Sequence, residues 1–180
     1  MVEEDEATGT VAELYDTVKR ELQMPFVPNM VKTIGASPAA LAIHMGMFQA
    51  MYANVTIPHS LVAMICYTVA EHANCEYCSV NNELFCRTLG IDEETLAQVA
   101  RDLGNVNPER IRVIIQFAIK MSVNPQSMTN EDFDGMREFG VSDAEILEIV
   151  LVTAHAVSDD IIADTLKVPV ESAVYTALGR

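Results

Sequence analysis

Apolar residues recur at helical spacing along almost the whole chain of 180 residues. In the stretch 10–22, Val11, Leu14, Tyr15 and Val18 fall on one face, which is the pattern of an amphipathic helix. Proline, glycine or a capping residue separates each such stretch from the next. No stretch shows the convincing alternation of apolar and polar residues that marks a half-buried strand. The sequence therefore predicts an all-α protein.

The start and stop signals divide the chain into helices. Ser37 and Pro38 begin one of them, with serine as the N-cap and proline at the first helical position. Ser142, followed three residues later by Glu145, begins the longest one with a capping box. The signals predict helices over 10–22, 27–35, 38–54, 58–73, 75–90, 92–104, 108–121, 129–140 and 142–168, followed by a short tail helix. Because no linker or low-complexity tract interrupts them, we predict a single domain over residues 1–180.

The chain carries a formal net charge of −15 at neutral pH. A surplus of acidic groups repels nucleic-acid phosphates and anionic lipids, so we expect neither as a partner. The apolar stretches 39–55 and 146–157 are interrupted by polar residues and lack the roughly 18 apolar residues of a membrane span. The first residues, M-V-E-E-D-E, are acidic and do not form a secretory signal. We therefore expect a cytoplasmic protein.

Half of the residues are hydrophobic, and the mean hydropathy is +0.19. This apolar content is high for a monomer that does not cross a membrane. An excess of this kind indicates that some apolar surface is buried between identical subunits. The composition therefore predicts a homo-oligomer.

The segment 71–78 reads E-H-A-N-C-E-Y-C, and its two cysteines open a predicted helix. Their i, i+3 spacing places the sulfur atoms on one face, where small side-chain rotations allow a disulfide to form. The free N–H groups at a helix N-terminus stabilise a thiolate, so we expect a lowered cysteine pKa. A thiolate attacks peroxides and disulfides, and the second sulfur then closes the bridge. The motif predicts a redox-active dithiol.

Two other interpretations of this cysteine pair remain open. The first is half of a metal site, in which His72, Cys75 and Cys78 supply at most three of the four ligands that structural zinc takes. The second is a pair of buried thiols without a chemical role. Cys66 and Cys86 lie in apolar helical patterns, and we expect both to pack in the core. The redox interpretation is preferred, and we expect neither a metal nor a cofactor.

The same segment resembles the core of the carboxymuconolactone decarboxylase and alkylhydroperoxidase D (AhpD-like) superfamily. The resemblance extends to F-V-P-N-M-V-K-T-I-G-A-S-P-A-A-L upstream and to F-G-V-S-D-A-E-I-L-E-I-V downstream, and so spans most of the chain. It implies an all-helical AhpD-like bundle that assembles as trimers or hexamers. Members with the C-x-x-C motif reduce peroxides or disulfides, whereas the true decarboxylases generally lack the cysteine pair.

The resemblance also implies roles for individual residues. Carried over, Cys78 is the thiolate that attacks the peroxide, and Cys75 is the thiol that resolves the intermediate. Peroxidase members use a relay glutamate twelve residues before the first cysteine and a relay histidine four residues after the second. Those positions are Ala63 and Asn82 here, and neither side chain acts as a general base. The departure favours dithiol–disulfide exchange over peroxide reduction.

Other polar residues near the motif are candidates for the missing relay. Glu71 and His72 precede Cys75 by about one helical turn, and we hypothesise that one of them partly replaces it. Asn82 shares a helix face with Cys78 and can hydrogen-bond a sulfur or a bound substrate.

The sequence thus predicts a thiol–disulfide oxidoreductase that reduces hydroperoxides or disulfides through Cys75 and Cys78, with a possible protein dithiol as electron donor. One alternative is a decarboxylase-like lyase that does not use the cysteines. Another is a non-enzymatic helical assembly whose catalytic site has decayed.

Overall fold

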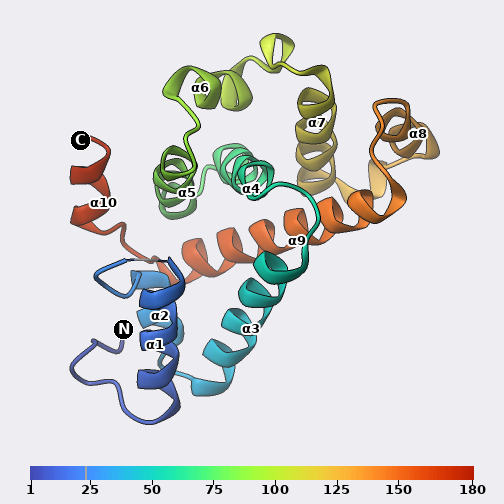
Figure 1. Ribbon diagram of the computed structural model, residues 1–180. Coiled ribbons are helices and arrows are strands. Elements are labelled where there is room, and N and C mark those ends of the chain that lie inside the picture. Colours follow the sequence, from blue (N-terminus) through green and yellow to red (C-terminus); the bar gives the residue numbers. More distant parts are fainter. Residues whose placement is uncertain (23) are drawn as a thin grey trace.

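The helix boundaries lie close to those that the capping and breaking residues predict. The computed structural model describes residues 1–22 and 24–180, and within these every regular element is helical, as expected (Figure 1). The elements are α1 Thr10–Leu22, α2 Asn29–Ile34, α3 Pro38–Asn54, α4 His59–Ala73, α5 Glu76–Thr88, α6 Glu93–Arg101, η1 Leu103–Asn105, α7 Glu109–Val123, η2 Pro125–Ser127, α8 Asn130–Glu138, α9 Asp143–Leu166 and α10 Ser172–Ala177.

The predicted caps form in the structure. The Ser37 hydroxyl accepts a hydrogen bond from the backbone N–H of Ala40 at 3.3 Å, and Pro38 occupies the first turn of α3. At the start of α9, Ser142 and Glu145 satisfy each other's backbone N–H groups in the predicted capping box. Caps of this kind typically contribute about 1 kcal/mol each, which explains why they locate the helix ends so well.

Helix α4 lies at the centre of the larger hydrophobic core. Every residue from Leu61 to Ala70 is buried, as the continuous apolar run predicts. This helix packs against α5, α7 and α9, and α9 crosses the molecule beneath it in Figure 1. The long helix α9 therefore holds its buried face against both α4 and α5.

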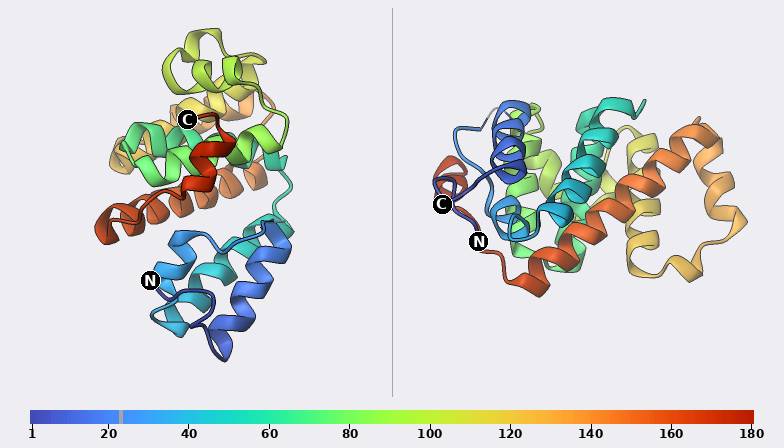
Figure 2. Two further views of the ribbon diagram at one scale, coloured as in Figure 1. Left: turned by 90° about the vertical axis from the view of Figure 1, so that its left-hand side faces the viewer. Right: turned by 90° about the horizontal axis from the view of Figure 1, so that it is seen from below.

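A second core joins the N-terminal helices to the rest of the chain. Figure 2 shows α1, α2 and α3 grouped on one side of α9. Their buried side chains, among them Tyr15, Met30 and Leu41, belong to one apolar cluster with Cys75 and Cys78. The N-terminal helices thus help to exclude water from the cysteine pair.

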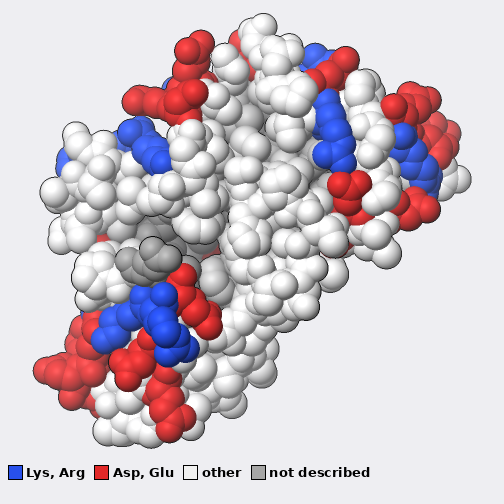
Figure 3. Space-filling view, in the orientation of Figure 1, with Lys and Arg blue, Asp and Glu red and all other residues white. Residues whose placement is uncertain are grey.

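Charged groups lie mainly toward the edges of the face shown in Figure 3, where Asp and Glu mix with a few Lys and Arg. The middle of this face carries few charges. No helix within residues 1–22 and 24–180 combines the length and the apolar content needed to cross a bilayer.

Candidate active site

The two cysteines are positioned by a sharp reversal between α4 and α5. Asn74 ends α4 in the left-handed conformation, with φ 57° and ψ 32°, which asparagine adopts more readily than other non-glycine residues. The N–H of Cys75 then donates to the carbonyl of Ala70 at 3.0 Å and completes the helix cap. Cys75 is the N-cap of α5, and Cys78 lies in its first turn. The reversal turns both thiols toward α9.

A carboxylate from α9 meets the two thiols. One ligand atom from each of Cys75, Cys78 and Asp160 lies within 4.8 Å of the other two. The three residues are 0%, 5% and 5% exposed. The four cysteines are all free thiols in this structure. The site therefore consists of a buried dithiol beside a buried carboxyl group.

The burial of Asp160 controls its acidity. Its pKa is raised from 3.8 to about 6, chiefly by the loss of water on burial. The charges of Asp159 and Asp164 contribute to this rise, and hydrogen bonding from the thiols of Cys78 and Cys75 opposes it. Within the described part of the chain, neither carboxyl oxygen of Asp160 has a partner at ordinary hydrogen-bond geometry. At neutral pH this group is an ionised and poorly satisfied proton acceptor.

The expected low thiol pKa is not found. The pKa of Cys78 is raised, first by its contact with the Cys75 thiol, then by burial and by the charge of Asp160. The prediction from the helix N-terminus alone was wrong, because it left out burial and a neighbouring carboxylate. A buried thiol beside an anion keeps its proton until a base removes it.

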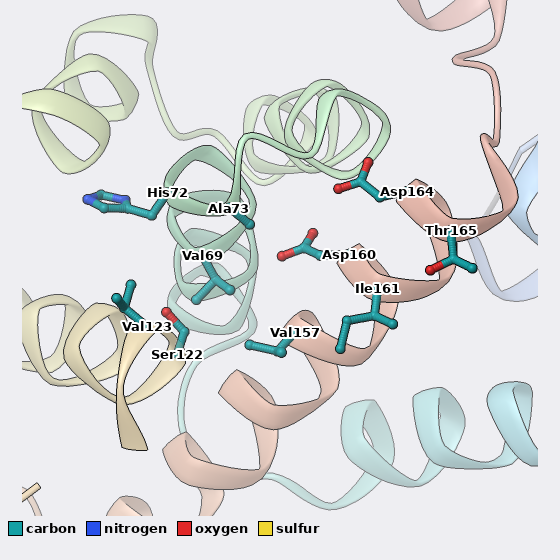
Figure 4. A pocket seen from close by; sticks show the side chains of 10 residues that line it. All are labelled: Val69, His72, Ala73, Ser122, Val123, Val157, Asp160, Ile161, Asp164 and Thr165. Carbon is teal, nitrogen blue, oxygen red and sulfur yellow. The ribbon is translucent and has the colours of Figure 1, made fainter. Parts of the chain in front are cut away.

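A solvent-open cavity of about 420 Å³ leads to this site (Figure 4). It lies between the end of α4, the end of α7 and the second half of α9, and Asp160 forms part of its wall. Its other lining residues are Val69, His72, Ala73, Ser122, Val123, Val157, Ile161, Asp164 and Thr165. The cysteines do not line the cavity, so Asp160 connects the cavity to the sulfur atoms.

The three other predicted site residues are not members of the cluster of two thiols and a carboxylate that the described residues form. His72 lines the cavity, but its imidazole points away from Asp160 in Figure 4. Its Nδ1 donates to the carbonyl of Thr68 at 2.9 Å. Glu71 and Asn82 are half-buried and belong to neither the cavity wall nor the cluster of thiols and carboxylate, as far as the described residues go. Their catalytic roles stay predictions.

Tyr77, between the two cysteines, fastens the motif to the N-terminal helices. Its buried hydroxyl accepts a hydrogen bond from the N–H of Met30 at 3.1 Å and donates one to Glu171 at 3.1 Å. Glu171 also accepts from the N–H of Asn29 at the start of α2. A single side chain thus connects α2, α5 and the segment before α10.

Replacing Tyr77 with phenylalanine should lower the free energy of unfolding by about 1–3 kcal/mol, because the buried N–H of Met30 and the carboxylate of Glu171 each lose a partner. Urea denaturation monitored by circular dichroism measures the change. The matched control is Tyr175→Phe, which removes the exposed hydrogen bond to Glu76 and should change stability by less than about 0.5 kcal/mol. Equal losses in the two variants would contradict this anchoring role.

The other two cysteines pack in the core. Cys66 and Cys86 are buried in the larger apolar cluster, as expected. Burial raises the pKa of Cys66, and it raises the pKa of Cys86 to about 12. Both thiols therefore stay protonated at neutral pH, as inert core cysteines do.

A second polar cluster lies on the other side of α9. Asp159 contacts His44 of α3 at 3.1 Å and His155 at 3.5 Å. Burial lowers the pKa of His155, which favours its neutral form. Consecutive helical residues point about 100° apart, so Asp159 faces α3 while Asp160 faces the cysteines. Only the second aspartate belongs to the candidate active site.

Asp160 is the site residue that the sequence predictions missed. The spacing of apolar residues in α9 could have indicated it. Asp160 lies four residues after Ala156 and three before Ala163, both buried, and therefore on the buried face of this helix. A carboxylate on such a face is rarely tolerated unless it is paired or functional. The C-x-x-C motif itself gives no signal for a residue 82 positions beyond Cys78.

Comparisons with known proteins establish the fold. No protein-family model matches the chain, and no curated protein matches it by sequence. The solved structures do match. A peroxidase-related protein from Silicibacter sp. TM1040 superposes with a TM-score of 0.83 at 20% identity, covering 91% of this chain and 86% of that one. A peroxidase-related protein with an alkylhydroperoxidase AhpD core, from Ralstonia eutropha JMP134, gives 0.81 at 22% identity, covering 92% and 90%.

The debrominase Bmp8 is a third structural neighbour. It gives a TM-score of 0.78 at 19% identity, covering 94% of this chain and 90% of its own. A cysteine-to-alanine variant of Bmp8 has been crystallised in complex with 2,3,4-tribromopyrrole. At these identities the likeness is one of fold. The chain has the all-α AhpD-like fold, and the expectation drawn from the resemblance is confirmed at that level.

Proposed function

We propose that this protein is a thiol–disulfide oxidoreductase of the AhpD-like type, in which Cys75 and Cys78 form a redox pair that reduces hydroperoxides or disulfides. One observation carries the proposal: the two sulfurs and the Asp160 carboxylate lie within 4.8 Å of one another, beside a cavity open to solvent. The peroxidase-related names of the structural neighbours support the same chemistry.

The proposed first step needs a base, because the Cys78 thiol has a raised pKa. The Asp160 carboxylate accepts the thiol proton as the sulfur attacks the outer peroxide oxygen. The O–O bond breaks, Cys78 becomes a sulfenic acid, and the alcohol leaves with the proton that Asp160 held. The Cys75 thiol then attacks the Cys78 sulfur, and the sulfenic hydroxyl and the Cys75 proton leave as water.

The products of this cycle are one disulfide, one alcohol and one water per hydroperoxide. The disulfide returns to the dithiol by exchange with an external dithiol, which is itself oxidised. With a disulfide substrate, Cys78 attacks a sulfur of that substrate and Cys75 resolves the mixed disulfide. Asp160 serves as the general base in place of the relay glutamate and histidine, whose positions are Ala63 and Asn82 here. Peroxide reduction is therefore as well supported as disulfide exchange.

The cavity fits a small organic substrate. Its volume of about 420 Å³ lies in the range of small-molecule sites, about 300–1,000 Å³. Apolar lining residues, among them Val69, Val157 and Ile161, favour an organic hydroperoxide over hydrogen peroxide. In the debrominase Bmp8, the complex with 2,3,4-tribromopyrrole shows that this fold accommodates a halogenated aromatic compound in that protein.

The test is mass spectrometry of the reduced protein after one equivalent of cumene hydroperoxide. The proposal expects a loss of two hydrogens, located by peptide mapping to the segment that contains Cys75 and Cys78. An unchanged mass with both hydroperoxides and small disulfides would favour a decayed site. Turnover that survives Cys75→Ser and Cys78→Ser would favour a lyase that does not use the cysteines.

The raised pKa of Cys78 predicts slow alkylation of the resting dithiol. In the reduced protein, with a chelator present, iodoacetamide should modify Cys78 at least about 10-fold more slowly than free cysteine at neutral pH. The rate should rise with pH. A thiol with a raised pKa is still protonated at the pH values at which free cysteine ionises, so more thiolate forms only at higher pH. Alkylation followed by mass spectrometry checks this, with the denatured chain as control. Modification faster than that of free cysteine would show instead that the helix N-terminus lowers the pKa of Cys78.

The expected partners are a small hydroperoxide or disulfide and a dithiol electron donor. Exposed apolar side chains on α3 and α9 support the predicted homo-oligomer, since Ile43 is 74% exposed and Leu147 is 65% exposed. Light scattering after size-exclusion chromatography measures the subunit number, for which the resemblance implies a trimer or hexamer.

A further inference from the structure

We infer that the reduced Cys75–Cys78–Asp160 cluster is also a zinc site, which binds one Zn²⁺ through two thiolates and the carboxylate and releases it when the cysteines are oxidised. Binding of the ion requires only the three donors. Its release rests on the proposed function, because release needs a disulfide to form between the two ligands.

The positions of the donor atoms support this assignment. In a tetrahedral zinc site, Zn–S distances near 2.3 Å and Zn–O distances near 2.1 Å separate neighbouring donors by about 3.5 to 3.8 Å. The three donor atoms here already lie within 4.8 Å of one another. They come from the N-cap and the first turn of α5 and from the second half of α9. Small side-chain rotations therefore suffice to close the site around an ion.

The electrostatic surroundings of Asp160 also favour a bound cation. Among the described residues, both oxygens of Asp160 are buried and lack a partner at ordinary hydrogen-bond geometry, and the nearby donors that act on them are the thiols of Cys75 and Cys78, the other two members of the cluster. The nearby charges of Asp159 and Asp164 are also negative and add to the cost of ionising this carboxyl group. Leaving a buried carboxylate unpaired is costly, and a divalent ion offsets that cost. The cluster therefore has both the donors and the uncompensated charge of a metal site.

The donor set selects the metal. Mg²⁺ and Ca²⁺ take oxygen ligands and do not match two sulfurs. Cu⁺ prefers soft ligands alone, whereas Zn²⁺ binds thiolates and carboxylates together. Three protein ligands leave a fourth position for water, which fits the opening of the cavity beside Asp160.

Oxidation would remove two of the three ligands. A hydroperoxide, two protons and the zinc-bound pair of thiolates give the Cys75–Cys78 disulfide, an alcohol, water and free Zn²⁺. The sulfurs lose two electrons in all, and the O–O bond accepts them. A disulfide no longer offers thiolates, so Asp160 alone cannot hold the ion. Zinc occupancy would thus report the redox state of the pair.

The binding test titrates Zn²⁺ into the reduced, metal-free protein against a chromophoric chelator. The inference expects one zinc per chain, with affinity lowered at least about 100-fold in Cys78→Ser and at least about 10-fold in Asp160→Asn. Asp164→Asn is the matched control, because it removes a nearby charge but no donor and should lower the affinity less than Asp160→Asn does. Co²⁺ substitution should add a thiolate-to-cobalt charge-transfer band that Cys78→Ser weakens. Circular dichroism confirms that each variant is folded.

The outcomes separate the zinc site from the proposed function. Absence of stoichiometric zinc binding, or equal losses in Asp160→Asn and Asp164→Asn, would overturn the site. Adding cumene hydroperoxide to the zinc-loaded protein should release one zinc per disulfide formed. Disulfide formation with the zinc retained would overturn the coupling and leave the oxidoreductase intact. Zinc bound by the three donors in a protein that forms no disulfide would support the site and overturn the proposed function.

Discussion

Replacing Cys78 with serine should lower hydroperoxide-dependent turnover at least about 1000-fold, because the variant lacks the proposed nucleophile and its hydroxyl cannot form a disulfide. Turnover is measured as consumption of a hydroperoxide with a dithiol such as dithiothreitol as electron donor. Of the two cysteines in the motif, Cys78 is the one whose proton Asp160 is proposed to accept. The first chemical step should therefore disappear in this variant.

The Cys75→Ser variant distinguishes attack from resolution. Cys78 should still react once with the hydroperoxide, and the reaction should stop at a sulfenic acid that a dimedone probe captures. Cys66→Ala serves as a control, since Cys66 is buried in the other apolar cluster and should leave turnover within about 2-fold. Sulfenic acid on Cys75 in the Cys78→Ser variant would reverse the two roles. Full turnover in both motif variants would rule out the redox pair.

Most of the helical architecture could be predicted from the sequence, because its signals are local. A cap such as Ser142 with Glu145 acts within one turn, and the run Leu61–Ala70 is apolar on every side. Neither signal depends on the rest of the fold. The sequence could not predict which helices meet, since that depends on packing between segments far apart in the chain.

Only the part of the candidate site that is close in sequence, the cysteine pair, could be predicted. The C-x-x-C spacing correctly places two thiols near each other at the start of α5. The acidity of Cys78 was predicted with the wrong sign, because a local argument includes the helix N-terminus and omits burial and the Asp160 carboxylate. A base supplied by another helix, as proposed for Asp160, gives no signal next to the cysteines in the sequence, where Glu71 and His72 are the candidates.

Replacing Asp160 with asparagine should reduce the rate of the hydroperoxide reaction about 100-fold, the lower end of what a general base contributes. Asparagine keeps the shape of the side chain but cannot accept the Cys78 proton. Stopped-flow measurement of the first turnover isolates this step. Asp164→Asn removes a neighbouring charge but not the base, so it should reduce the rate by less than about 10-fold. An unchanged first turnover in Asp160→Asn would exclude Asp160 as the base.

The same substitution should raise thermal stability at neutral pH, which separates loss of a base from loss of structure. The folded-state pKa of Asp160, about 6, lies above its ordinary value of 3.8, so ionisation of this buried group opposes folding. In the metal-free protein the cost is absent below the ordinary pKa, develops as pH rises from 3.8 to about 6, and is fully present at neutral pH. The Tm advantage of Asp160→Asn over wild type should therefore shrink as pH falls toward 4. A variant that is both less active and less stable at neutral pH would show that the carboxylate supports the fold. Lower activity with a higher Tm would show that the Asp160 carboxylate destabilises the fold and serves the reaction.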